Sequence, residues 1–179
     1  MLRLTVPPRE LFDEKTNLFE TTRETVLCLE HSLISISKWE SKWLKPFLTK
    51  TPKSAAETLD YICCMTLTQN VPPLVYRALS AENMAQIQAY IESPMTATWF
   101  KNQPGKVSRD VVTSELIYYW MIACGIPMEC EKWHINRLLT LIRVCNEKNK
   151  TPQKKNPKQR AASRSALNAA RRRQYGSRG

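Results

Sequence analysis

The chain has 179 residues, and its 27 Lys and Arg against 16 Asp and Glu give a formal net charge of +11. At 42% hydrophobic residues with five Trp, the composition excludes an intrinsically disordered chain, and the length suits one domain of ordinary size. No apolar run reaches the roughly 18–20 residues of a membrane-spanning helix, and the first residues lack the apolar segment of a signal peptide.

Two N-terminal segments alternate between apolar and polar residues. Residues 2–6 (LRLTV) end at a pair of prolines, and residues 24–30 (ETVLCLE) repeat the alternation. A two-residue period is typical of a strand with one buried face. The polar stretch 13–17 (DEKTN) between them predicts a turn. We therefore expect a small N-terminal β hairpin or sheet.

The next segments are divided by proline and contain almost no glycine, which argues against a β-sandwich or barrel. Ser32 is the predicted N-cap of a helix that runs to Lys45 and ends before Pro46. Thr51-Pro52 predicts the start of a second helix, as N-cap and first helical residue. Its apolar side is predicted to comprise Ala56, Leu59, Cys63 and Leu67.

Further along, Pro72-Pro73 opens a short segment that reaches Leu79, and Ser80 begins a helix that closes at Ser93-Pro94. Met84, Ile87 and Ile91 are predicted to face inward in that helix, and residues 101–110 are predicted to form a polar loop.

Two strongly patterned helices follow. Thr113 caps the first, with Leu116, Ile117, Trp120 and Cys124 on one face. Pro127 leads into the second helix, predicted at 129–146, whose apolar face comprises Ile135, Leu138, Leu139 and Ile142. The short connection predicts an antiparallel pair.

The excess of positive over negative charge is confined to the C-terminal end of the chain. Residues 1–147 contain all 16 acidic residues and 16 basic ones, whereas residues 148–179 hold the other 11 basic residues and no acidic one. The sequence therefore predicts a mainly α fold with a small N-terminal β hairpin or sheet (α+β) over residues 1–147. A basic tail follows at 148–179, largely disordered or conditionally helical. Residues 148–159 are predicted to be a solvated linker, and residues 160–173 have good helix propensity with Leu167 as their one large aliphatic side chain.

Such a tail binds polyanions with strong salt dependence. Three interpretations remain open: nonspecific nucleic-acid contact, an arm that folds on an acidic protein partner, and a solubilising tail. The tail is not expected to recognise a nucleotide sequence, because Tyr175 is its one aromatic residue that could stack on a base. The predicted polyanion-binding residues are Lys154, Lys155, Lys158, Arg160, Arg164, Arg171, Arg172 and Arg173.

No common catalytic motif occurs in the sequence, and only two His are present. His31 is expected to cap a helix or form a surface hydrogen bond. Cys130 and His134 are four residues apart, with Cys124 across the turn, but a zinc site needs four ligands, so helix packing is the expected role. We expect no metal, no cofactor and no catalysis. The six Cys are expected to be reduced, buried thiols of a cytosolic protein.

The aromatic residues allow two interpretations. Trp39 and Trp43 are four residues apart on a helix that also carries lysines, which suits core packing with solvated lysines opposite. Alternatively, aromatic residues anchor a protein partner, because Trp and Tyr are favoured at interfaces. The predicted partner-binding residues are Trp39, Trp43, Tyr118, Tyr119 and Trp133.

Several segments resemble a family of tailed-bacteriophage proteins, the tail assembly chaperones of siphovirus tail gene modules. They are residues 29–48 (LEHSLISISKWESKWLKPFL), 59–67 (LDYICCMTL), 113–149 (TSELIYYWMIACGIPMECEKWHINRLLTLIRVCNEKN) and 167–179 (LNAARRRQYGSRG). The family has no active-site motif, so the resemblance transfers no functional residue.

The resemblance implies a non-enzymatic role in the cytoplasm of the infected bacterial host. Such proteins bind the long, aggregation-prone tape-measure protein and keep it soluble while tail tube protein polymerises around it. The basic tail would then engage acidic surface on the tape-measure or tube protein. The alternative is a virion- or packaging-associated protein that binds nucleic acid nonspecifically through residues 148–178.

Overall fold

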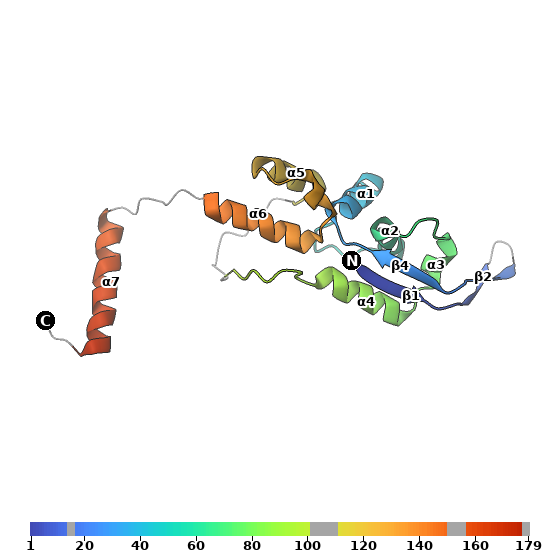
Figure 1. Ribbon diagram of the computed structural model, residues 1–179, viewed down its shortest axis with the longest axis horizontal. Coiled ribbons are helices and arrows are strands. Elements are labelled where there is room, and N and C mark those ends of the chain that lie inside the picture. Colours follow the sequence, from blue (N-terminus) through green and yellow to red (C-terminus); the bar gives the residue numbers. More distant parts are fainter. Residues whose placement is uncertain (14–16, 101–110, 150–156, 177–179) are drawn as a thin grey trace. The chain divides into compact units, whose positions relative to one another are not determined.

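The computed structural model describes residues 1–13, 17–100, 111–149 and 157–176 (Figure 1). The chain divides into two compact units, Met1–Cys145 and Asn146–Gly179. The first unit contains the β elements and most of the helices, and the second contains the C-terminal helix. The boundary that charge predicts, after Glu147, falls within the same helix, α6, as the division between the units.

The N-terminal strands β1 (Leu2–Val6) and β4 (Thr25–Leu29) pair antiparallel, with Leu2 opposite Leu29 and Val6 opposite Thr25. Leu4, Val6, Leu27 and Leu29 are buried, and Val26 is exposed. The alternation in the sequence therefore identifies the two strands correctly, and the alternate leucines and Val6 form their buried face.

A second pair of strands, β2 (Glu10–Asp13) and β3 (Leu18–Thr21), was not expected. The two pair antiparallel, and Thr22 N–H donates to the Arg9 carbonyl at 2.8 Å, where this ribbon meets the first one. Every residue of β3 is exposed, so no buried face marks it in the sequence. The expected turn 13–17 lies partly outside the described residues; Asn17 within it has a φ of 58°.

Helix α1 (Leu33–Trp43) begins as predicted, with the Ser32 hydroxyl accepting the Ser35 N–H. It ends earlier than expected because Leu44 adopts a left-handed conformation and its N–H donates to the Glu40 carbonyl at 2.8 Å. This bond closes the helix in the manner of a left-handed C-cap.

The predicted start of the second helix at Thr51-Pro52 is wrong. Helix α2 (Ala55–Met65) begins after Ser54, which forms a capping box with Glu57, each side chain bonding the other's backbone N–H. Two orphan amides are satisfied in this way, which a Thr51 cap would not achieve. The predicted stripe is wrong as well: the buried residues of α2 are Glu57, Tyr61, Ile62 and Met65.

Two further helices follow, α3 (Pro73–Arg77) and α4 (Ala81–Glu92). Ser80 caps α4 as predicted, and Ile87 is buried. Asn83 Nδ2 donates to the Thr5 carbonyl at 3.2 Å, which ties the start of α4 to β1, and the two elements lie side by side in Figure 1. The predicted loop 101–110 lies outside the described residues.

Thr113 caps α5 (Ser114–Ala123) as predicted. The expected single helix over 129–146 is wrong: a 3₁₀ turn, η1 (Met128–Lys132), precedes α6 (Ile135–Asn149). Trp133 between them is extended, and Ile135 N–H donates to the His31 carbonyl at 2.7 Å. This long-range bond replaces a helical one and interrupts the helix.

The predicted pairing of the last two helices of the body is also largely wrong, because α5 packs mainly against α1. The thiols of Cys124 and Cys145 form a hydrogen bond between the end of α5 and α6. In the second unit, residues Pro157–Tyr175 form helix α7.

The prediction of a mainly α fold with a small N-terminal β part is confirmed.

Candidate functional site

Trp39 is a core residue, so the core-packing interpretation is confirmed for it and its predicted role on a docking surface is wrong. Its exposed fraction is 1%, and its indole N–H donates to the Glu57 carbonyl at 2.9 Å. The Phe47 ring packs edge-on against it at 5.2 Å between centroids. Trp39 therefore joins α1 to α2 and is not available to a partner.

Three other predicted anchors are half-buried and already have partners in the molecule. Trp43 stacks on Trp39, and its indole N–H donates to Asp60 at 2.8 Å. The Tyr118 hydroxyl donates to Glu131 at 2.8 Å. The ring of Trp133 is covered by Arg137, whose guanidinium carbon is 4.1 Å from the ring centroid.

Tyr119 is the predicted anchor that the structure leaves exposed. Its exposed fraction is 64%, and Ile122, three residues further along α5, is exposed to 70%. Residues three apart lie on the same face of a helix. With the exposed Ala123 they form what we call the α5 outer face (Tyr119, Ile122, Ala123).

The opposite side of α5 is apolar too. Ile117 and Met121 are fully buried, and Leu116 and Trp120 are half-buried. The helix sequence SELIYYWMIA contains no charged residue after Glu115. A helix that is apolar all round is normally buried on every side. The exposed apolar face of α5 could therefore have been predicted from the sequence, because the segment from Leu116 to Ala123 has no charged residue on the side opposite its buried residues.

A buried carboxylate fixes the position of α5. Glu40 on α1 is 7% exposed. Its two oxygens accept the backbone N–H groups of Phe47 and Ser114, each at 2.7 Å. Ser114 is the first residue of α5, where negative charge also complements the helix dipole. The outer face is therefore presented on a rigidly anchored helix.

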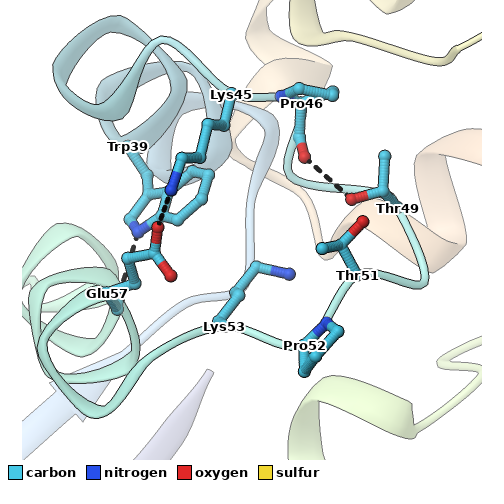
Figure 2. A pocket seen from close by; sticks show the side chains of 8 residues that line it. All are labelled: Trp39, Lys45, Pro46, Thr49, Thr51, Pro52, Lys53 and Glu57. Atoms are coloured by element: carbon cyan, nitrogen blue, oxygen red, sulfur yellow. Dashed lines mark hydrogen bonds and ion pairs between the residues drawn. The ribbon is translucent and has the colours of Figure 1, made fainter.

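A pocket of about 250 Å³ opens beside α1 and α2 (Figure 2). Lys45 and Glu57 point toward one another across it, with 2.6 Å between Nζ and Oε1. The Lys53 ammonium donates to the Phe47 carbonyl at 2.9 Å. The lining residues are Trp39, Lys45, Pro46, Thr49, Thr51, Pro52, Lys53 and Glu57.

Two of the three charged side chains of this pocket, Lys45 and Glu57, already form an ion pair with each other. The hydrogen bond from Lys45, together with the Ser54 N–H, lowers the pKa of Glu57 to about 2. Burial lowers the pKa of Lys53 below its ordinary value. None of the eight lining residues is a His, Cys or Ser. The volume lies below the roughly 300–1,000 Å³ of ordinary ligand pockets. Three larger hollows, of about 340, 430 and 500 Å³, fall within that range, and they too have no His, Cys or Ser among their lining residues. We therefore place the candidate site on the α5 outer face instead.

The two His residues meet in the interior rather than on the surface. Their ring centroids are 5.0 Å apart, and both are buried. His31 Nδ1 shares a hydrogen bond with the Tyr61 hydroxyl. His134 Nε2 donates to the Tyr90 carbonyl at 3.0 Å, and its Nδ1 accepts the Asn136 N–H. The expected capping or surface role of His31 is therefore wrong.

The buried His pair makes the stability of the protein dependent on pH. Burial, then the nearby His134 and Lys53, lowers the pKa of His31 from 6.5 to about 3. Between these two values the unfolded chain binds a proton that the folded one does not. We expect the free energy of unfolding to fall by roughly 2–3 kcal/mol from pH 6.5 to 4.5. Urea titrations at several pH values measure it.

The His31→Gln variant removes this titration and is expected to show a flatter pH dependence in the same range. The slope that remains belongs to His134, whose pKa burial also lowers, and near pH 4.5 to Glu57, whose pKa is lowered in the folded protein. An unchanged slope in the variant would contradict the assignment to His31.

Cys130 and His134, which the sequence suggested as possible zinc ligands on one helix, are arranged differently in the structure. Cys130 lies in η1 and His134 precedes α6, so the two do not share a helix face. Among the residues that the structure describes, no three His, Cys, Asp or Glu side chains are grouped to hold a metal ion.

The expectation of buried thiols is wrong for most of the six cysteines: Cys130 is buried, Cys63 is exposed and the others are intermediate.

Most of the predicted polyanion-binding residues lie on α7. Lys154 and Lys155 are outside the described residues, and Lys158 and Arg160 belong to the first turn of the helix. The side chains of Arg164, Arg171, Arg172 and Arg173 are exposed.

No described helix combines the length and the apolar character that crossing a membrane requires. No protein-family model, curated protein or solved structure matches the chain.

Proposed function

We propose that this protein is a non-catalytic binding protein that acts as a tail assembly chaperone of a tailed bacteriophage. It binds the tape-measure protein in the cytoplasm of the infected cell and assists assembly of the tail tube around it. The proposal joins the resemblance of the sequence to the character of the exposed surface.

The observation that carries the proposal is the α5 outer face. Tyr119 and Ile122 are exposed to 64% and 70% on a helix whose other side is part of the core. An amphipathic helix of a partner buries such a face by placing its own apolar stripe against it. Tape-measure proteins are long and helical, so they offer stripes of this kind. Because Glu40 holds α5 in place, little conformational entropy is lost on binding.

The proposal is tested by co-expression with the tape-measure protein of the same virus. We expect the wild-type chain to keep that protein in the supernatant after centrifugation and to co-purify with it. The double variant Tyr119→Ser, Ile122→Ser is expected to weaken binding by roughly 10- to 100-fold, since each residue is an apolar anchor at the centre of the face. Calorimetric titration gives the affinity.

The matched control replaces two exposed apolar residues elsewhere. Leu18 and Phe19 on β3 are exposed to 64% and 72%, and the variant Leu18→Ser, Phe19→Ser is expected to bind as wild type does. The α5 double variant should unfold within about 0.5 kcal/mol of wild type because its replaced side chains are on the surface. The control variant also removes the contact between the Phe19 and Phe12 rings, whose centroids are 5.2 Å apart, so a loss of about 1 kcal/mol is expected for it. Equal losses of affinity in the two variants would refute the assignment to α5.

A further inference from the structure

The positive charges of helix α7 do not all stabilise the helix itself. Between Pro157 and Tyr175 it has six basic residues and no acidic one. Basic residues in the last turn, such as Arg172 and Arg173, are favourable for a helix because they complement its dipole. Arg164 lies in the middle of the helix, and α7 has no acidic side chain to pair with it. The charge pattern therefore suits an external anion.

The exposed side chains of α7 argue against an apolar groove as the partner. Leu167 and Tyr175 are its large apolar residues, exposed to 55% and 77%, and they are eight positions apart. A helix that docks in an apolar groove needs anchors at successive turns. Single-stranded nucleic acid is disfavoured as well, because base stacking requires several aromatic platforms and α7 has Tyr175 alone.

The arginines face more than one side of the helix. Arg164 and Arg171 are seven residues apart, so they lie on one face, about 10 Å from each other along the axis. Arg173 projects about 200° from Arg171, on the opposite side. Charge on two opposite sides fits a helix that lies between two rows of anions.

The size of α7 fits the major groove of B-form DNA. That groove is about 12 Å wide and accepts an α-helix, with a phosphate backbone along each side. Small exposed side chains keep the helix narrow; they are Ala161, Ala162, Ala166, Ala169 and Ala170. The deep, narrow major groove of an RNA duplex does not admit a helix with its side chains. Arginine is suited to phosphate because its guanidinium forms two parallel hydrogen bonds.

We infer that α7 binds double-stranded DNA by lying in the major groove, where Arg164, Arg171 and Arg173 contact phosphates of both strands without reading the sequence. This activity is separate from the docking of a protein partner on α5. It gives the protein a second ligand, the viral or host duplex.

The test uses the full chain and a fluorescent 20-base-pair DNA duplex, with anisotropy measured between 50 and 200 mM NaCl. Each phosphate contact contributes roughly −0.9 to the slope of log affinity against log salt. The variant Arg164→Gln, Arg171→Gln, Arg173→Gln is therefore expected to bind at least 10-fold more weakly and to flatten the slope by roughly 2–3. The triple Lys variant keeps the charge and is expected to bind within a few-fold of wild type. A second duplex of unrelated sequence should bind equally.

Three further probes separate the alternatives. An RNA duplex, a 20-nucleotide single strand and polyglutamate are each expected to bind at least 10-fold more weakly than the DNA duplex at 100 mM NaCl. Tighter binding of any of them, or an unchanged affinity of the Gln variant for the duplex, would overturn the inference. The Tyr119→Ser, Ile122→Ser variant should bind the duplex as wild type does, so failure here is distinguishable from failure of the α5 proposal.

Discussion

Replacing Trp39 with Ala is expected to lower the free energy of unfolding by about 3–5 kcal/mol. The indole is the largest fully buried side chain, and it packs against both Trp43 and Phe47. Its removal leaves a cavity between α1 and α2 and loses the hydrogen bond from the indole N–H to the Glu57 carbonyl. Equilibrium unfolding in urea, followed by far-UV circular dichroism, measures the change.

Two further variants separate the contribution of Trp39 packing from that of its hydrogen bond and from the general effect of removing an indole. Trp39→Phe keeps most of the volume and loses the hydrogen bond to the Glu57 carbonyl, so a loss of about 1–2 kcal/mol is expected. Trp99 is exposed to 91%, and Trp99→Ala should leave stability within about 0.5 kcal/mol of wild type. If Trp39→Ala were as stable as Trp99→Ala, the placement of Trp39 in the core would be wrong.

Replacing Glu40 with Ala is expected to cost about 3 kcal/mol, because two buried backbone N–H groups lose their acceptor. The groups belong to Phe47 and Ser114, so the turn after α1 and the first turn of α5 both loosen. The isosteric Glu40→Gln keeps one acceptor oxygen and is expected to lose about 2 kcal/mol. Urea unfolding gives the stability, and hydrogen exchange of the Ser114 amide reports the local effect.

Glu24 provides the control for Glu40, because it is an exposed carboxylate. Glu24→Ala is expected to change the free energy of unfolding by less than about 0.5 kcal/mol. Slow exchange of the Ser114 amide in Glu40→Ala would show that another group holds the start of α5.

Local signals in the sequence predicted much of the fold. The strands at 2–6 and 25–29 follow from a two-residue alternation, and Ser32, Ser80 and Thr113 are helix caps as expected. The same type of reasoning failed at Thr51. A Thr-Pro pair satisfies the general preference for a helix start, but Ser54 with Glu57 satisfies two amides together, and the helix begins there.

Long-range hydrogen bonds account for the features that the sequence did not reveal. The break between η1 and α6 depends on the bond from Ile135 to the His31 carbonyl, which joins residues about a hundred positions apart. The meeting of His31 with His134 follows from the same contact. No periodicity within either segment contains that information.

The candidate site was predicted in part. Aromatic composition indicated five anchors, but Trp39 lies in the core, as the alternative interpretation of its helical spacing had predicted. Tyr119 was among the five, and Ile122 beside it was missed. Its signal was present, because the segment from Leu116 to Ala123 is apolar on every side.

Hydrogen–deuterium exchange of the full chain, with and without the tape-measure protein of the same virus, tests the docking proposal most directly. We expect the partner to slow exchange across residues 114–123 by at least 10-fold, and to leave the ribbon of β2 and β3 unchanged. A complex that forms with unchanged exchange in α5, or that protects β2 and β3 instead, would contradict the proposal that the α5 outer face is the docking surface.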